Sequence, residues 1–264
     1  MSYNLNNKTA LITGGSKGIG KDIVKKFIDS NCNVAFTYLS SDEEAAKIEK
    51  EFGSNNLKIK KYKSDASNFE ASSKLVEDVI KDFGGFDILI NNAGAIPSGS
   101  VFSVTEDAWR EGWELKVFGY IEMTRAFYSI FRERGHGVIL NDIGNSGENP
   151  DFDYVAGSTG NSALMTFTKA MGGTSLDYGV RVLAVNPGPV DTGRMEKMLR
   201  QRASMLFEDE ERWQELLARF PGGRASTPEE IATSIVFLSS PLASYINGCI
   251  VTIDGGISAR GSII

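Results

Sequence analysis

The feature that most constrains this chain is the glycine-rich segment TGGSKGIG at residues 13–20. It follows a short apolar run, residues 9–12, that is typical of a buried strand, and it leads directly into a helical pattern. Gly14 allows a tight turn there, Gly18 lets the backbone approach a ligand, and Gly20 lets helix and strand pack closely. An ordinary strand-to-helix loop is the alternative. The free N–H groups and the helix dipole predict a binding site for a dinucleotide diphosphate.

Strand-like and helix-like segments alternate along nearly the whole chain. The strand-like segments are residues 9–12, 33–38, 57–64, 86–90, 137–143, 180–186 and 249–253. The helix-like segments are residues 19–27, 42–52, 68–83, 105–134 and 156–176, with a further helix that begins at Thr227. This alternation predicts one doubly wound α/β domain over residues 1–264, with a parallel sheet and helices on both faces. The pattern loosens only over residues 189–226, which we expect to form a flap over the substrate.

The composition excludes several classes of protein. The formal net charge of -6 argues against a nucleic-acid-binding surface. No apolar run is long enough to span a membrane and residues 1–8 are polar, so we expect a cytoplasmic protein without a membrane partner. A single histidine, His136, and two distant cysteines, Cys32 and Cys249, offer no metal-binding spacing and suit a reducing compartment. We therefore expect no metal site.

Four motifs that occur in order along the chain resemble those of the short-chain dehydrogenase/reductase family. They are TGxxxGxG at residues 13–20, NNAG at 91–94, NPG at 186–188 and DGG at 254–256. The resemblance implies a Rossmann-like fold and assembly as a homodimer or homotetramer. It also implies an NAD(P)-dependent oxidoreductase that moves a hydride to or from a carbonyl or polarised alkene of a small, partly apolar substrate.

The resemblance also implies where the cofactor binds. The residues expected at the diphosphate and adenosine ribose are Gly14, Ser16, Lys17, Gly18, Ile19 and Gly20. Those expected beside the adenine are Asp65 and Ala66, and those beside the second ribose are Asn92, Ala93 and Gly94. The nicotinamide carboxamide is expected at Pro187, Gly188, Val190 and Thr192. Asn91 is expected to be structural and to hold neighbouring strands together.

The end of the second strand decides which nicotinamide cofactor is preferred. An acid there accepts the 2′-hydroxyl of NAD, but this chain has Tyr38 at that position. Lys17 offers a cation to a 2′-phosphate, and Ser40 and Ser41 offer hydroxyl groups, although Leu39 stands where NADP-preferring relatives often have arginine. We predict NADP, with NAD possible.

The family's usual catalytic side chains are a serine, a tyrosine, a lysine four residues after it, and an asparagine on the long helix. Counting along the motifs, we find that all four are replaced in this chain. The replacements are Gly144 for the serine, Gly157 for the tyrosine, Asn161 for the lysine and Lys116 for the asparagine.

The sequence suggests that the site is rearranged. Tyr154 precedes Asn161 by seven residues, which is similar to the Tyr-x6-Lys spacing of the enoyl-acyl-carrier-protein reductase branch. Lys116 could supply the charge that Asn161 lacks, because a buried ammonium near a phenol lowers a phenol's pKa from its usual value of about 10. Asn161 would keep the hydrogen bond to the ribose. The structural alternatives are that Tyr154 packs under the flap and that Lys116 is solvated or lies in a subunit interface.

Other polar residues leave further alternatives open. Ser146 could replace the missing serine hydroxyl, and Asp142 or Glu148 could accept a proton instead. The flap combines methionines with arginines, including Arg194, which suits an apolar substrate with a carboxylate or phosphate at its exposed end. An amphipathic helix packed on the body is the structural alternative. A second function is a catalytically lapsed NADP(H)-binding regulatory or scaffold module.

Overall fold

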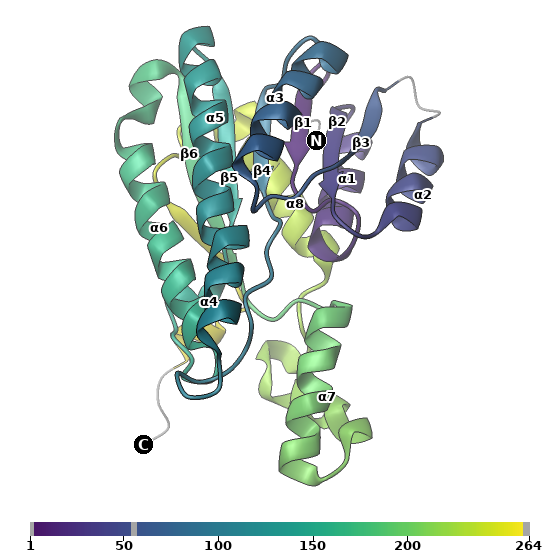
Figure 1. Cartoon of the computed structure of the whole chain (residues 1–264), viewed down its shortest axis with the longest axis vertical. Coiled ribbons are helices and arrows are strands. Elements are labelled where there is room, and N and C mark those ends of the chain that lie inside the picture. The colour runs from purple at the N-terminus through teal and green to yellow at the C-terminus, as the bar shows by residue number, and fades with distance from the viewer. Residues whose placement is uncertain (1–2, 54–56, 261–264) are drawn as a thin grey trace.

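Seven parallel strands form a single sheet in the order β3-β2-β1-β4-β5-β6-β7 (Figure 1). This computed structural model describes residues 3–53 and 57–260. The strands are β1 Thr9–Ile12, β2 Asn33–Tyr38, β3 Ile59–Lys63, β4 Ile88–Asn91, β5 Gly137–Asp142, β6 Val180–Pro187 and β7 Ile250–Ile253. The predicted doubly wound parallel fold is therefore confirmed. The predicted domain range of 1–264 includes residues 1–2, 54–56 and 261–264, which lie outside the described part, and it stays a prediction.

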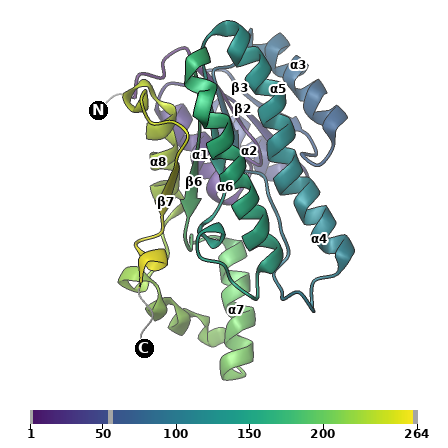
Figure 2. The same cartoon turned by 90° about the vertical axis from the view of Figure 1, so that its left-hand side faces the viewer.

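Helices cover both faces of the sheet (Figure 2). They are α1 Gly18–Asp29, α2 Asp42–Phe52, α3 Phe69–Phe83, α4 Glu106–Trp113, α5 Gly119–Arg134, α6 Val155–Ser175, α7 Gly193–Phe207 and α8 Pro228–Ser239. Successive strand residues point to opposite faces, so Ile12 packs with Phe27 of α1, whereas Leu11 packs with Phe127 of α5. Helices α1, α2 and α8 therefore lie on one face, and α3, α5 and α6 on the other.

The predicted helix over residues 105–134 is present but is interrupted. One turn of π-helix, Glu114–Phe118, separates α4 from α5. The start agrees with the sequence, because the Thr105 hydroxyl accepts a hydrogen bond from the Ala108 N–H at 3.2 Å. Such π turns are frequent at functional sites, and this one carries Lys116.

The prediction of an irregular flap over residues 189–226 is wrong in its secondary structure. Most of the segment is helical, comprising α7 and a 3₁₀ segment, Glu210–Arg219. The two pack on each other around Leu199, Ala203 and Leu216 and project away from the sheet (Figure 1). The flap therefore has a small core of its own and does not lie flat on the body.

The turns that follow β1 and β4 are locked together by side-chain hydrogen bonds. The Thr13 hydroxyl accepts from the N–H groups of Asn92 at 2.9 Å and Ala93 at 3.0 Å. The Asn92 amide donates in return to the carbonyls of Thr13 at 2.8 Å and Gly14 at 3.2 Å. These bonds fix the glycine-rich turn where the strand order reverses, which is where doubly wound sheets bind ligands.

Asn91 has the structural role expected from the sequence. Its amide donates to the side-chain oxygens of Asn141 at 2.8 Å and Thr124 at 3.2 Å, and the residue is fully buried. It thereby ties β4 to β5 and to α5.

We expect Thr13→Val to lower the free energy of unfolding by about 1–2 kcal/mol, because it leaves the N–H groups of the half-buried Asn92 and Ala93 without this acceptor. Thr13→Ser keeps the hydroxyl and is expected to stay close to the wild type. Urea unfolding followed by circular dichroism measures the difference. A valine variant as stable as the serine variant would show that this hydroxyl does not hold the two turns together.

Candidate active site

The glycine-rich turn has the shape of a phosphate cradle. Gly14 and Gly18 have positive φ angles of 68° and 55°, which favour glycine. A Cβ on Gly20 would collide with the carbonyl oxygen of Gly14, whereas one on Gly18 would meet only the Thr192 methyl, 3.8 Å away. The turn is therefore closely packed at Gly20. At Gly18 it is open, and Thr192 lies across this open space.

The first turn of α1 is open to an anion. Lys17 occupies its N-cap position without a side-chain hydrogen bond, and the first turn contains no acidic residue. Four other α-helices of the described part are capped by side chains, namely those of Asn68, Thr105, Thr192 and Thr227. The N–H groups that begin α1 thus suit the diphosphate that the sequence predicts.

The other predicted cofactor residues lie at the carboxyl ends of strands. Pro187 ends β6, and Gly188 packs so closely on Asp254 that a Cβ would lie 2.7 Å from the Asp254 Cβ. Val190 and Thr192 follow, and the backbone of Val190 bridges to Ser226. Beyond β3, the Asp65 carboxylate accepts from the Ser67 hydroxyl at 2.6 Å, and the Ala66 carbonyl packs against Gly119.

An acid that was not predicted as part of the cofactor site lies shortly after the end of β2. The Tyr38 hydroxyl donates to the Asp42 carboxylate at 3.0 Å, and Lys63 lies 3.4 Å from the same carboxylate. The bond from Tyr38 lowers the pKa of Asp42, so this group is ionised at neutral pH. Asp42 lies four residues after Tyr38, at the first position of α2, where an acid is also typical of a helix start.

The Tyr154 ring lies over Gly157. Tyr154 immediately precedes α6, and a Cβ at Gly157 would collide with the phenol ring. The phenol therefore fills the space that a side chain at position 157 would need. The preceding residue, Asp153, anchors this end of the loop because its carbonyl accepts from the Gly99 N–H at 2.6 Å.

Lys116 reaches from the π turn to the end of β5. Its ammonium donates to the Ile143 carbonyl, and its chain crosses Gly94, where a Cβ would lie 2.8 Å from the Lys116 Cδ. Burial lowers the pKa of Lys116 to about 8, although the nearby Asp142 carboxylate acts in the opposite direction and raises this pKa. Burial also raises the pKa of Asp142 to about 6, although the positive charge of Lys116 acts to lower it. At pH 7 the two groups carry opposite charges.

Asn161 has a buried acceptor without a partner. Its amide nitrogen donates to the Ser146 hydroxyl at 2.8 Å and to the Gly144 carbonyl at 3.4 Å. Within the described part of the chain, its Oδ1 atom is buried and makes no hydrogen bond. A hydroxyl donor such as that of a ribose suits this atom. Glu148 is engaged elsewhere, since its carboxylate accepts from the Thr252 hydroxyl at 2.6 Å.

Arg194 joins the site from the flap, a position that the sequence did not reveal. Its Nη2 donates to the Ile96 carbonyl at 2.9 Å and to the Tyr154 hydroxyl at 3.4 Å. The structure thus forms two groups of site residues. One consists of Tyr154 and Arg194, and the other consists of Lys116, Asp142 and the carbonyl of Ile143.

Neither a membrane-spanning helix nor a metal site finds support among residues 3–53 and 57–260. None of these residues belongs to a helix that is long and apolar enough to cross a membrane. Nor do they include three or more histidine, cysteine, aspartate or glutamate side chains grouped so as to hold a metal ion.

Comparisons with known proteins support the fold. A family model described as "Enoyl-(Acyl carrier protein) reductase" matches residues 14–258. An acetoacetyl-CoA reductase of Rhizobium meliloti is 32% identical over 254 residues, which cover 95% of this chain and 98% of the relative. A 3-oxoacyl-[acyl-carrier-protein] reductase of Vibrio harveyi is 31% identical over 259 residues, or 96% of this chain and 98% of the relative. The L-sorbose reductase of Gluconobacter frateurii, solved with NADPH and L-sorbose, superposes with a TM-score of 0.88 at 28% identity, covering 97% of this chain and 98% of that one.

We expect Gly157→Ala to lower the free energy of unfolding by about 1–3 kcal/mol, because the new methyl group and the Tyr154 ring cannot share one space. Gly173→Ala, in the same helix, is the control. Nothing lies within 4 Å of the added carbon at Gly173, so this variant is expected to gain up to about 1 kcal/mol. Thermal unfolding compares the two, and equal shifts would mean that the ring does not cover Gly157.

Proposed function

Because the chain belongs to the short-chain dehydrogenase/reductase family, we propose that it is an NAD(P)-dependent oxidoreductase with a rearranged catalytic site. It moves a hydride to or from a carbonyl or polarised alkene of a small, partly apolar substrate. The observation that carries the rearrangement is the Tyr154 ring, which fills the space beside Gly157. A phenol thus remains available to α6 although position 157 has no side chain.

The comparisons favour an enzyme over a catalytically lapsed NADP(H)-binding module. The two relatives compared in sequence and the solved L-sorbose reductase are all reductases. The chain also keeps a hydroxyl, an ammonium and a carboxylate around the ends of β4 and β5, in Tyr154, Lys116 and Asp142. Lys116 and Asp142 also shift each other's pKa, and perturbed pKa values of this kind cluster at functional sites.

NADP is the proposed cofactor, and NAD stays the alternative. The glycine-rich turn would hold its diphosphate, the exposed Lys17 a 2′-phosphate, and Asn161 a ribose hydroxyl. The L-sorbose reductase was solved with NADPH, which supports this choice. Asp42 weighs towards NAD, although Tyr38 and Lys63 both satisfy its carboxylate. When bound, the nicotinamide supplies or accepts the hydride.

Tyr154 and Lys116 divide the remaining chemistry between them. In the reductive direction the Tyr154 hydroxyl gives its proton to the substrate oxygen, and in the oxidative direction it takes one back. Lys116 holds a positive charge at the end of β5, where it favours the anionic oxygen that develops during the transfer. Asn161 then keeps only the role of binding the ribose.

Two further expectations from the sequence stay predictions. These are assembly as a homodimer or homotetramer and a cytoplasmic location.

We expect the enzyme to bind NADPH more tightly than NADH. Lys17→Ala should weaken NADPH binding by about tenfold and leave NADH binding nearly unchanged, because it removes the cation proposed to bind the 2′-phosphate. Lys25→Ala, on an exposed position of α1, is the control. Fluorescence titration gives the dissociation constants, and equal constants or a preference for NADH in the wild type would reverse the assignment.

Tyr154→Phe and Lys116→Met are each expected to lower kcat by about 100-fold or more, with unchanged affinity for NADPH. Turnover is followed at the cofactor absorbance with a panel of ketones, quinones and enoyl thioesters. Tyr245→Phe and Lys169→Met, both at exposed positions, are the controls. Unchanged turnover in both site variants would end the relocated-site proposal.

The same experiment has a signature in pH. Lys116 is charged below its pKa of about 8, so kcat for reduction should fall as the pH rises through that value. Lys116→Met should lack this alkaline fall, because no charge remains to be lost. A wild-type profile that is flat from pH 7 to about 9.5 would show that the charge of Lys116 does not act in the reaction.

A further inference from the structure

Arg194 is the flap residue that touches the proposed catalytic phenol. It lies in the first turn of α7, two residues after the Thr192 cap. One nitrogen, Nη2, spans from the flap to the body, where it donates to the Ile96 carbonyl at 2.9 Å and to the Tyr154 hydroxyl at 3.4 Å. A permanent positive charge therefore lies directly beside the group that is proposed to move the proton.

The charge of Arg194 is not neutralised by a carboxylate. Three other flap arginines are paired, Arg200 with Glu196 at 2.9 Å, Arg212 with Glu215 at 2.7 Å and Arg224 with Glu230 at 2.8 Å. Among the described residues, no carboxylate lies within 4.0 Å of Arg194, and its Nε and Nη1 donate to no protein acceptor. A guanidinium has five N–H donors in a planar fork that matches a carboxylate, so most of this fork is available.

The surroundings add positive charge. Burial is the main cause that lowers the pKa of Lys116, and the charge of Arg194 contributes in the same direction. Arg194 also lies in the first turn of α7, at the positive end of its helix dipole. Asp142 is the carboxylate whose charge acts on Lys116, and no ion pair joins it to Arg194 within the described part of the chain. A guanidinium without a carboxylate partner favours an anionic ligand.

We propose that Arg194 binds the carboxylate of the substrate, and that the substrate is a 2-oxo or 3-oxo acid or the corresponding hydroxy acid. This inference rests on the proposed function, because it takes Tyr154 as the proton donor. Since Arg194 lies within 3.4 Å of the Tyr154 hydroxyl, a ligand that contacts both must have its carboxylate only a few bonds from the reacting oxygen. During reduction a C–H bond forms at the carbonyl carbon, the π electrons move to oxygen, and the Tyr154 proton joins that oxygen. The nicotinamide dinucleotide is the reductant, and the carboxylate is unchanged.

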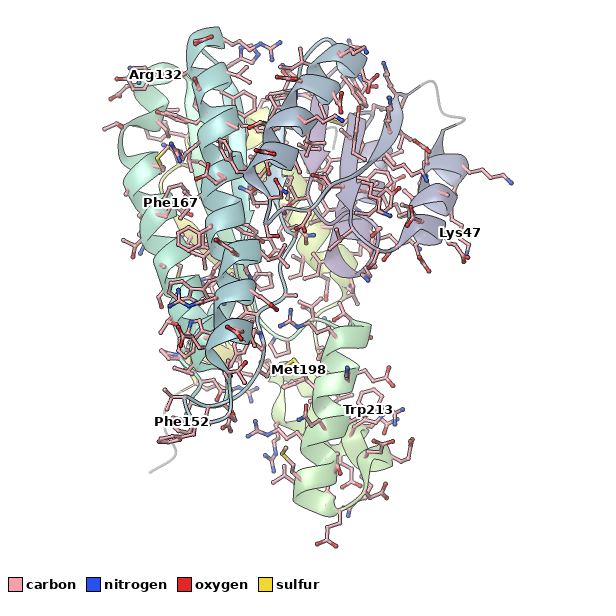
Figure 3. The ribbon with its side chains drawn as sticks, viewed as in Figure 1. Lys47, Arg132, Phe152, Phe167, Met198 and Trp213 are labelled. Carbon is pink, nitrogen blue, oxygen red and sulfur yellow. The ribbon has the colours of Figure 1, made fainter. Side chains whose placement is uncertain are left out.

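The rest of the substrate is expected to be short and apolar. Phe152 and Met198 are exposed, at 65% and 44%, and they come from the loop before Tyr154 and from α7. In Figure 3 Phe152 lies at the lower end of the body, and Met198 lies on the side of α7 that is turned towards it. Apolar side chains at these places suit an alkyl group that extends away from the carboxylate.

The test compares acids with their neutral esters. The ligands are 2-oxopentanoate and 3-oxopentanoate, each with its methyl ester, titrated by calorimetry into the full chain in the presence of NADP⁺. We expect the wild type to bind at least one acid about 10- to 100-fold more tightly than its ester, as a charge-assisted ion pair provides. Arg194→Gln should remove this difference without weakening the ester, and Arg194→Lys should keep part of it. Arg202→Gln is the control, because Arg202 is an exposed arginine of the same helix.

The outcomes separate this inference from the proposed function. Equal binding of acid and ester by the wild type, or equal loss of both in Arg194→Gln, overturns the role of Arg194. Oxidation of NADPH by neutral ketones and esters but not by the acids also overturns it, while the oxidoreductase proposal stands. Binding of an acid through Arg194 without any NADPH oxidation supports the carboxylate site and removes the proposed function instead.

Discussion

The hydrogen bonds around the Thr13 hydroxyl are the constraint on which the site depends. Thr13 accepts two N–H groups from the turn after β4, and Asn92 returns two bonds to the turn after β1. The two strands are neighbours in the sheet, yet the chain between them forms β2, β3 and three helices. Because both turns are held at one place, the open start of α1 and the backbone crossed by Lys116 keep a fixed separation. The other residues of the candidate site lie around these two turns.

Much of the fold could be predicted because it depends on local patterns. The strand over residues 33–38 and the helix over 42–52 were predicted with the bounds that the structure has, since a buried apolar run and an acidic helix start are both local signals. The flap was predicted as irregular, with an amphipathic helix only as the alternative, although Met195, Leu199, Ala203 and Phe207 recur at the i, i+4 spacing of a helix face. The many charges of that segment obscured the pattern. The small core of the flap is completed by Leu216 of the 3₁₀ segment Glu210–Arg219. The packing of α7 on this segment is a tertiary contact, which local spacing does not reveal.

The π turn and the contacts of the site could not be predicted for different reasons. A π turn adds one residue to a helical turn, and the apolar spacing on either side changes too little to reveal it. The sequence did place Tyr154, Lys116 and Asn161 as candidates, by counting from the motifs. It could not show that the Tyr154 ring lies over Gly157, or that Arg194, forty residues later, reaches its hydroxyl. Such contacts depend on how the flap returns to the body, and no local spacing encodes that.

The proposed site is best understood as a separation of two roles that one lysine combines in the family's usual arrangement. On α6, Asn161 has a neutral amide and cannot act as a cation, but its buried Oδ1 still offers an acceptor for a ribose hydroxyl. In the proposed site the cation is Lys116, and from the π turn its ammonium donates to the Ile143 carbonyl. That position leaves the phenol without a cation on its α6 side. Arg194 supplies one from α7, so the charge next to Tyr154 depends on a segment that lies outside the sheet and its covering helices. An anionic substrate would thus be bound by the same guanidinium that already lies beside the Tyr154 hydroxyl.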